Sequence, residues 1–390
     1  MSQKWEISHL AAGLTAVVVG YSSAVVIVIE AAKAAGASPD MVTSWLLTLG
    51  LGMGTTCIIF SWLYKVPVVT AWSTPGAAFL IGSVQGYSLQ EVIGSFVLAG
   101  VFSLIAAQNR FLTKKIESIP SSISSAMLAG ILLPICVKVF ADASSYPWLV
   151  FGFVAIYLIG GLWFPRFLML ILLGLGVIVS LVSGSFTEVE WGNLMPTLVW
   201  VTPDFSISAT IGLAIPLFLI TMLSQNLPGI AILKSYDFHP NLKVVLTSIG
   251  GLQILTAPFG GFAYNLAAIT AAICMGEEAG SDRQQRYRAA IFAGVGYVIF
   301  GLMASIVVVV FTYMPQVVVH LLAGLALVAT LQASLLKAID EHTYRHAATI
   351  TLLCTASGMI LLHLGAPVWG LFLGLLVVGL QKFKANTQTG

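Results

Sequence analysis

Charged residues are scarce in this chain of 390 residues. They make up 8% of it, whereas hydrophobic residues make up 58% and the mean hydropathy is +0.98. A soluble domain carries about 25% charged residues, so the composition excludes a soluble protein. The formal net charge is +2, and the scattered basic residues provide no footprint for nucleic acid. We therefore expect one membrane domain, 1–390, whose surroundings are the lipid bilayer.

Cysteine pairs and catalytic motifs are also missing. There is no His-Glu-x-x-His zinc motif, no nucleophile elbow and no Gly-Lys-Ser/Thr phosphate loop. Each of the 4 cysteines stands alone in an apolar segment, without metal-ligand spacing or a disulfide pattern: Cys57, Cys136, Cys274 and Cys354. The sequence predicts that the protein is not an enzyme and that it holds neither a metal nor a cofactor.

Long apolar runs are abundant. A membrane-spanning helix needs about 20 apolar residues, and fewer where the segment is interrupted. The runs predict an all-α polytopic membrane protein with about fourteen spans, at 8–33, 41–64, 66–83, 88–108, 120–141, 147–164, 166–183, 207–235, 241–257, 258–276, 289–312, 315–337, 345–363 and 365–382.

Lysine and arginine test this layout, because they collect in short cytoplasmic loops. With the N-terminus inside, alternation places all 17 basic residues except Lys33 and Lys138 on the cytoplasmic side. The widest polar gap, 183–206, then lies outside, with seven spans before it and seven after it. We expect two inverted repeats, 1–190 and 205–390, in a bacterial-type inner membrane, with both termini cytoplasmic.

Two of the spans are interrupted, and the later one is 256–276, TAPFGGFAYNLAAITAAICMG. Pro258 and Gly260 make its first half a poor helix. A new helix is expected after them, with Tyr264 and Asn265 in its first turn. Because lipid cannot satisfy free N–H groups, a helix that starts inside the bilayer must face protein or a water-filled cavity.

The earlier interrupted span is 70–82, TAWSTPGAAFLIG, in which an extended piece precedes Pro75 and Gly76. One interrupted span in each half of the chain is the pattern of transporters that hold their substrate between two half-helices. The two segments are therefore expected to meet at one binding site near the middle of the membrane.

This predicted site favours an anion, because the N-terminal end of a helix carries partial positive charge. Aromatic and alanine side chains around it suit an aromatic body, so the expected substrate is an aromatic carboxylate. The alternative for Gln225, Asn226 and Asn265 is that they only hydrogen-bond between helices. The candidate substrate-binding residues are Ser22, Thr74, Gly76, Ala77, Phe79, Gln225, Asn226, Gly261, Tyr264 and Asn265.

Glu30 is the candidate for carrying a coupling proton, because it lies towards the outer end of the first span. The alternative is a solvated ion pair with the nearby Lys33. His320 stands isolated in its span, where a hydrogen bond between helices is the expected role.

Three stretches resemble the benzoate:proton symporter (BenE) family: PGAA at 75–78, QNLPG at 225–229 and GGFAYNLAAITAAIC at 260–274. The family is related to the nucleobase permeases and the sulfate/bicarbonate anion transporters. This resemblance implies a seven-plus-seven inverted repeat with short β-like stretches in spans three and ten. It also implies proton coupling, a core part (8–108 and 207–312) that moves against a gate part (120–183 and 315–382) and, by analogy, a homodimer.

The chain departs from the uracil-permease pattern, whose substrate-binding glutamates would fall near Gln225 and Tyr264. A site without carboxylates suits an anion better than a nucleobase. The residues thus predict transport of an aromatic carboxylate by alternating access, and the resemblance implies that the substrate is benzoate or a similar acid taken up with a proton. An anion exchanger, an uncoupled anion pathway and a nucleobase-like permease stay open within transport, and a membrane scaffold or receptor is the alternative from another class.

Overall fold

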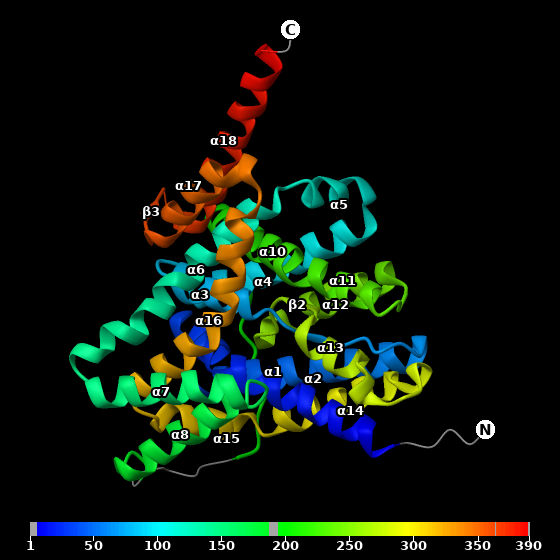
Figure 1. The fold of residues 1–390 in the computed structure, drawn as a ribbon, viewed down its shortest axis with the longest axis vertical. Coiled ribbons are helices and arrows are strands. Elements are labelled where there is room, and N and C mark those ends of the chain that lie inside the picture. The colour runs from blue at the N-terminus through cyan, green and yellow to red at the C-terminus, as the bar shows by residue number, and fades with distance from the viewer. Residues whose placement is uncertain (1–5, 187–193, 363, 389–390) are drawn as a thin grey trace.

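The computed structural model describes residues 6–186, 194–362 and 364–388, most of them in helices (Figure 1). In this described part, eight helices are long and apolar enough to cross a membrane, and a bent pair of helices makes a ninth. The eight run over Ile7–Ala34, Pro39–Tyr64, Leu89–Gln108, Ser121–Ser144, Ile207–Ser235, Leu242–Phe259, Gln316–Asp340 and Ala366–Lys384. The count of fourteen spans and the inverted repeat stay predictions, and the expected repeat boundary at residue 190 lies outside the described residues.

Sequence signals at the helix ends match the observed bounds. Ser38 caps the helix that begins at Pro39, and Ser88 forms a capping box with Glu91. The helices are α1 (Ile7–Ala34), α2 (Pro39–Tyr64), α3 (Thr74–Ser83), α4 (Leu89–Gln108), α5 (Arg110–Glu117), α6 (Ser121–Ala141), α7 (Pro147–Trp163), α8 (Leu168–Val182), α9 (Ile207–Ala209), α10 (Ile215–Thr221), α11 (Leu227–Ser235), α12 (Leu242–Thr256), α13 (Ile269–Met275), α14 (Tyr287–Leu302), α15 (Ala304–Tyr313), α16 (Gln316–Asp340), α17 (Arg345–Ala356) and α18 (Ala366–Gln388).

The two interrupted segments meet as an antiparallel strand pair, β1 (Thr70–Trp72) and β2 (Tyr264–Leu266). Ala71 lies opposite Asn265, and Figure 1 places β2 near the middle of the molecule. The prediction that Tyr264 and Asn265 begin a helix is wrong, since α13 starts only at Ile269. These residues are extended because their backbone pairs with β1, which satisfies the polar groups that lipid cannot.

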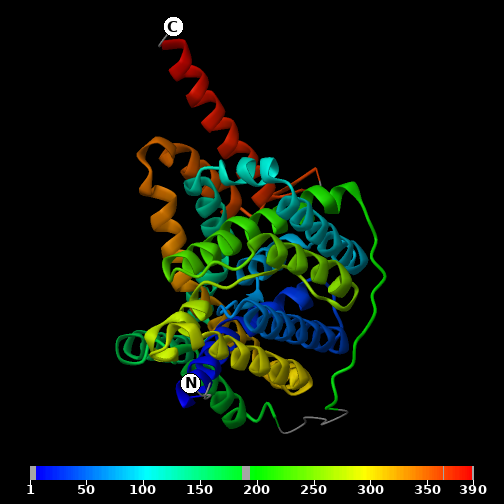
Figure 2. The same cartoon turned by 90° about the vertical axis from the view of Figure 1, so that its right-hand side faces the viewer.

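The helices pack in two sets. The strand-containing set comprises α1–α4 and α9–α15, where α2 packs on α14, α4 on α12, and α1 on both α3 and α14. The α6 set comprises α6–α8 and α16–α18, where α6 packs on α16 and α17, and α17 on α18. A small separate hydrophobic cluster lies wholly within the α6 set. Helix α18 extends away from the other helices at one end of the molecule (Figures 1 and 2).

Two predicted spans differ in detail from the observed helices. The segment 289–312 is bent by 58° between α14 and α15. The segment 345–363 was expected to be helical to its end, but α17 stops at Ala356 and a short hairpin follows, β3 (Ile360–Leu361) paired with β4 (Leu364–Gly365). Gly358 has a positive φ of 65° just after α17, a conformation that ends a helix.

Candidate functional site

The strand pair holds the N-terminus of α3 in place. The Ser73 N–H donates to the Ala263 carbonyl at 2.9 Å, which extends the contact between the two interrupted segments. The Ser73 hydroxyl accepts the Gly76 N–H at 3.0 Å and its carbonyl accepts the Ala77 N–H at 2.8 Å. Since Pro75 has no N–H, Thr74 supplies the remaining N–H of the first turn, and its side chain is half-buried.

The β2 side is held by the helix that contains Gln225 and Asn226. The buried Asn226 accepts the Leu266 N–H through Oδ1 at 2.9 Å, whereas Gln225 is half-buried and its side chain has no hydrogen bond within the described part of the chain. Asn265 is fully buried, and its Nδ2 donates to the Ala263 carbonyl at 3.4 Å. Its Oδ1 has no partner among the described residues. Of these three amides, Gln225 is the one that is only half-buried.

Tyr264 packs against α2, and Gly261 lies against the end of α12. The Tyr264 hydroxyl donates to the Thr48 carbonyl at 3.1 Å and accepts from Thr256 at 3.3 Å. A Cβ on Gly261 would overlap the Thr256 side chain. The neighbouring Phe262 packs against Trp45 and Phe96. This side of the interrupted segment anchors the turn in the core of the strand-containing set.

The three remaining predicted substrate residues are also buried. Ala77 is 0% exposed and Phe79 1%, while Ser22 is 8% exposed, with its hydroxyl 3.5 Å from the Val19 carbonyl. Gly76 packs close to Leu217, which a Cβ at residue 76 would approach to 2.9 Å. The structure therefore gathers the predicted residues around the strand pair and α3, but leaves mainly Thr74 and Gln225 accessible.

A cavity of about 320 Å³ lies between the two sets of helices, against α3 and α6. We call it the α3–α6 cavity. Its apolar lining includes Phe79 and Ile81 from α3 and Ile131 and Ile135 from α6, with further residues from α16, α17 and α18. Glu30 also lines it. Among the described residues of the lining, Phe79 and Glu30 are the two that the sequence analysis proposes for the site. Ligand pockets fall in the range of about 300–1,000 Å³, so its size suits a small molecule.

Charged groups gather at one end of this cavity. Glu30, which is 18% exposed, pairs with Lys33 at 3.2 Å, as the alternative for Glu30 expects. His320 makes the predicted hydrogen bond between helical segments, because its Nδ1 lies 2.9 Å from Asp142 Oδ2, just beyond the end of α6. Lys138, in the last turn of α6, lines the same cavity.

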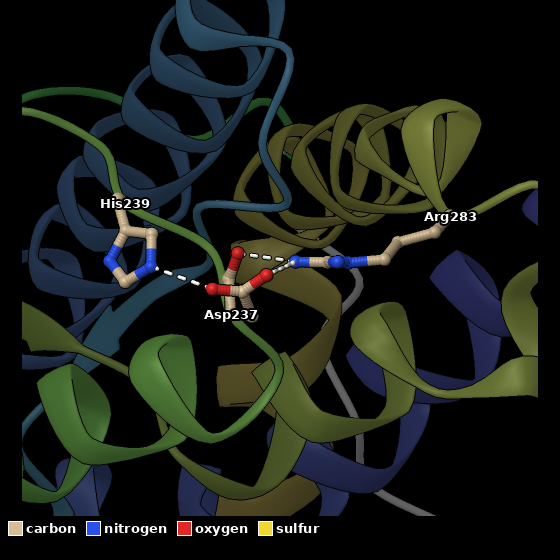
Figure 3. Close-up of polar contacts among 3 residues, drawn as sticks. All are labelled: Asp237, His239 and Arg283. Carbon is tan, nitrogen blue, oxygen red and sulfur yellow. Dashed lines mark hydrogen bonds and ion pairs between the residues drawn. The ribbon is translucent and has the colours of Figure 1, made fainter.

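A separate polar cluster joins two loops of the strand-containing set (Figure 3). His239 Nε2 lies 2.9 Å from Asp237 Oδ1, and Arg283 Nη2 bonds both the Asp237 carbonyl and, at 3.0 Å, its Oδ2. These bonds, that of His239 first and that of Arg283 next, lower the pKa of the Asp237 carboxyl. Within the described residues no group of three or more His, Cys, Asp or Glu side chains could hold a metal.

Family comparison decides the class of this protein. A family model described as benzoate membrane transport protein matches residues 3–380. The chain belongs to this benzoate transport family. It is therefore a multi-pass membrane transporter and not an enzyme.

Two relatives of this benzoate transport family member match along nearly its whole length. Inner membrane protein YdcO of Escherichia coli is 37% identical over 367 residues, which cover 94% of this chain and 93% of that protein. The benzoate membrane transport protein of Acinetobacter baylyi is 34% identical over 376 residues, which cover 96% of this chain and 95% of that protein.

Solved structures show what fold this member of the benzoate transport family has. The transmembrane domain of the cyanobacterial bicarbonate transporter BicA matches with a TM-score of 0.56 at 15% identity, over 94% of this chain and 97% of that chain. The murine Solute Carrier 26 family member A9 anion transporter, in its inward-facing state, matches with a TM-score of 0.58 at 13% identity, over 98% of this chain and 69% of that chain. The fold is thus the mostly helical, polytopic fold of these anion transporters.

Sequence reasoning missed three features of this family member's site. Ser73 was not singled out, although serine before Thr-Pro is a typical helix cap and signals its role. Lys138 entered only as one of the two basic residues on the outer side, and Asp142, the partner of His320, lies 178 positions away in the chain. The available signal for the charged lining of the cavity was that Lys33 and Lys138 are the two basic residues predicted on the outer side.

Proposed function

We propose that the protein takes up benzoate or a similar aromatic carboxylate together with a proton. The observation that carries this proposal is the antiparallel pairing of β1 with β2, which brings both interrupted spans to one point beside α3. The half-buried Thr74 and Gln225 are the polar groups there that can donate to a carboxylate. Membership in the benzoate transport family supports the substrate class.

The cap at the N-terminus of α3 limits which N–H groups can bind an anion. Ser73 already accepts the Gly76 and Ala77 N–H groups, so Thr74 provides the backbone N–H and a hydroxyl. The partial positive charge of the helix end still favours an anion, by about 0.3–2 kcal/mol. The Gln225 amide completes the contact, while Phe79 and its apolar neighbours on the cavity wall suit the aromatic ring.

Movement of one set of helices against the other would provide alternating access. In this proposal the strand-containing set acts as the core part and the α6 set as the gate part, with the α3–α6 cavity between them. Glu30, on the cavity wall, is the proposed carrier of the proton. The inner membrane location, the cytoplasmic termini and the homodimer belong to the same proposal, which the segregation of lysine and arginine supports for the termini.

A thermal-shift screen of the purified protein tests the substrate class, since a ligand that binds only the folded state raises the unfolding temperature. Benzoate and salicylate are expected to raise it in proportion to the logarithm of their concentration, whereas uracil is not. Sulfate and bicarbonate serve as anion controls without an aromatic ring. Stabilisation by uracil alone would favour a nucleobase-like permease, and stabilisation by sulfate or bicarbonate alone would favour an inorganic anion exchanger.

A further inference from the structure

One face of α6 forms a wall of the α3–α6 cavity that is apolar along most of its length and positively charged at one end. Ile131, Pro134, Ile135 and Lys138 all line the cavity. Residues spaced by three, four and seven lie on one side of a helix, so the apolar stripe ends in a single cation. Lys138 is exposed, whereas Phe79 on the opposite wall is 1% exposed. The cavity lining is therefore exposed at Lys138.

The other charged groups at this end are already partnered. Glu30 pairs with Lys33 at 3.2 Å, and His320 lies 2.9 Å from Asp142. Lys138 has no carboxylate within 4.0 Å among the described residues, although it projects towards the same space. A cation without an anion, next to apolar side chains, matches a ligand that joins a negative group to an apolar body.

We infer that Lys138 binds the carboxylate of an incoming aromatic acid at the charged end of the α3–α6 cavity, ahead of the site at the strand pair. The aromatic ring then lies along Ile131 and Ile135 on the α6 wall. This second anion site rests on the proposed function, because it concerns the same substrate. The predicted topology makes Lys138 one of two basic residues on the outer side, so the site acts on external substrate only.

The test is the KM for benzoate measured from each side of the membrane in wild type and Lys138→Gln. In intact cells, Lys138→Gln is expected to raise the KM about three- to tenfold, since one partly exposed charge-assisted hydrogen bond is lost, with the maximal rate little changed. In inverted membrane vesicles the KM is expected to stay the same. The external KM of wild type should also rise with ionic strength, and that of Lys138→Gln should not.

Two variants control for charge and folding. Lys114→Gln removes an exposed lysine from α5, away from the cavity, and is expected to keep both KM values. Lys138→Arg keeps the positive charge and is expected to stay within about twofold of the wild-type KM. An external KM that is unchanged in Lys138→Gln, while wild type transports benzoate, would overturn the second site alone. A wild type that transports no benzoate from either side would overturn both proposals.

Discussion

The polar residues around the strand pair divide into two groups by their contacts. Asn226 is buried and accepts the Leu266 N–H, so it links its own helical segment to β2. Gln225, its neighbour in the chain, is half-buried and makes no side-chain hydrogen bond with the described residues. The sequence motif does not distinguish the two amides, whereas in the structure only Asn226 of the pair is held by a side-chain hydrogen bond among the described residues. We propose that Gln225 binds the ligand.

Substituting each amide by alanine is expected to separate these roles. Gln225→Ala loses a hydrogen bond to a charged ligand, which weakens apparent benzoate affinity about ten- to hundredfold with little change in stability. Asn226→Ala leaves the buried Leu266 N–H unsatisfied and lowers the free energy of unfolding by about 1–3 kcal/mol. Binding isotherms and thermal unfolding of both variants check this. Equal loss of stability in the two variants would show that Gln225 is structural as well.

Asp237 provides a second prediction at this scale, because its neighbours lower the pKa of its carboxyl. A lowered pKa means that the charged form stabilises the folded state above the usual pKa of the carboxyl. This contribution is then lost as the pH falls below that range towards the lowered pKa. Asp237→Asn is therefore expected to lower the unfolding temperature at neutral pH and to make no difference in strong acid. A difference that persists unchanged in acid would exclude the charged contact with Arg283 and His239 as its cause.

At the scale of elements, the turn between α12 and β2 depends on a glycine. Gly260 has a φ of +90°, and a Cβ at this position would overlap the Trp45 ring. The turn then leads into the strand that pairs with β1. A tight turn against an aromatic ring, and not helix propensity alone, makes this segment leave the helix.

Gly260→Ala is expected to destabilise the protein by about 2–5 kcal/mol, since backbone strain adds to overpacking against Trp45. Gly36→Ala is the matched control. Gly36 has a similar φ of +84°, but a Cβ there meets nothing within 4 Å. In the control, the free energy of unfolding should fall only by the cost of the backbone strain, about 1–2 kcal/mol. Thermal or denaturant unfolding of both variants measures the difference, and equal losses would contradict the packing argument.

Helices and strands were predictable where neighbouring residues determine them, and not where they depend on contacts with residues far away in the chain. Hydropathy placed most helix bounds, and Pro258 and Gly260 marked the interruption. Local pattern alone predicts a helix at Tyr264–Leu266, because the strand partner lies almost 200 residues earlier in the chain; only the family resemblance implies the β-like stretch that is observed there. Short apolar runs cannot be assigned to strand or helix by periodicity alone. A hydrogen bond between helices is predicted for His320, but its partner, Asp142, is not predictable for the same reason.

At the scale of the whole molecule, the two sets of helices touch through an ion pair and enclose a cavity. Arg166, which follows α7, pairs with Glu278, which follows α13, at 2.7 Å. The predicted topology puts this pair on the cytoplasmic side and the charged end of the α3–α6 cavity on the outer side. Partly exposed pairs contribute about 0–1 kcal/mol, so such a contact can open during transport.

The general architecture followed from composition and spacing, because lipid imposes long apolar helices and interrupted spans must be shielded. The detailed site did not follow in the same way. Which side chain of 225–226 bonds to β2 depends on the fold of the whole chain, and so does the cap by Ser73 on α3.

The central claim is that the protein carries an aromatic carboxylate across the membrane with a proton. Uptake of radiolabelled benzoate into proteoliposomes tests it most directly, at a pH where benzoate is ionised and with protein-free liposomes as the background. The account predicts saturable, protein-dependent uptake that an inward proton gradient accelerates and a protonophore abolishes. Uptake no greater than in protein-free liposomes, with the protein shown to be folded, would contradict it.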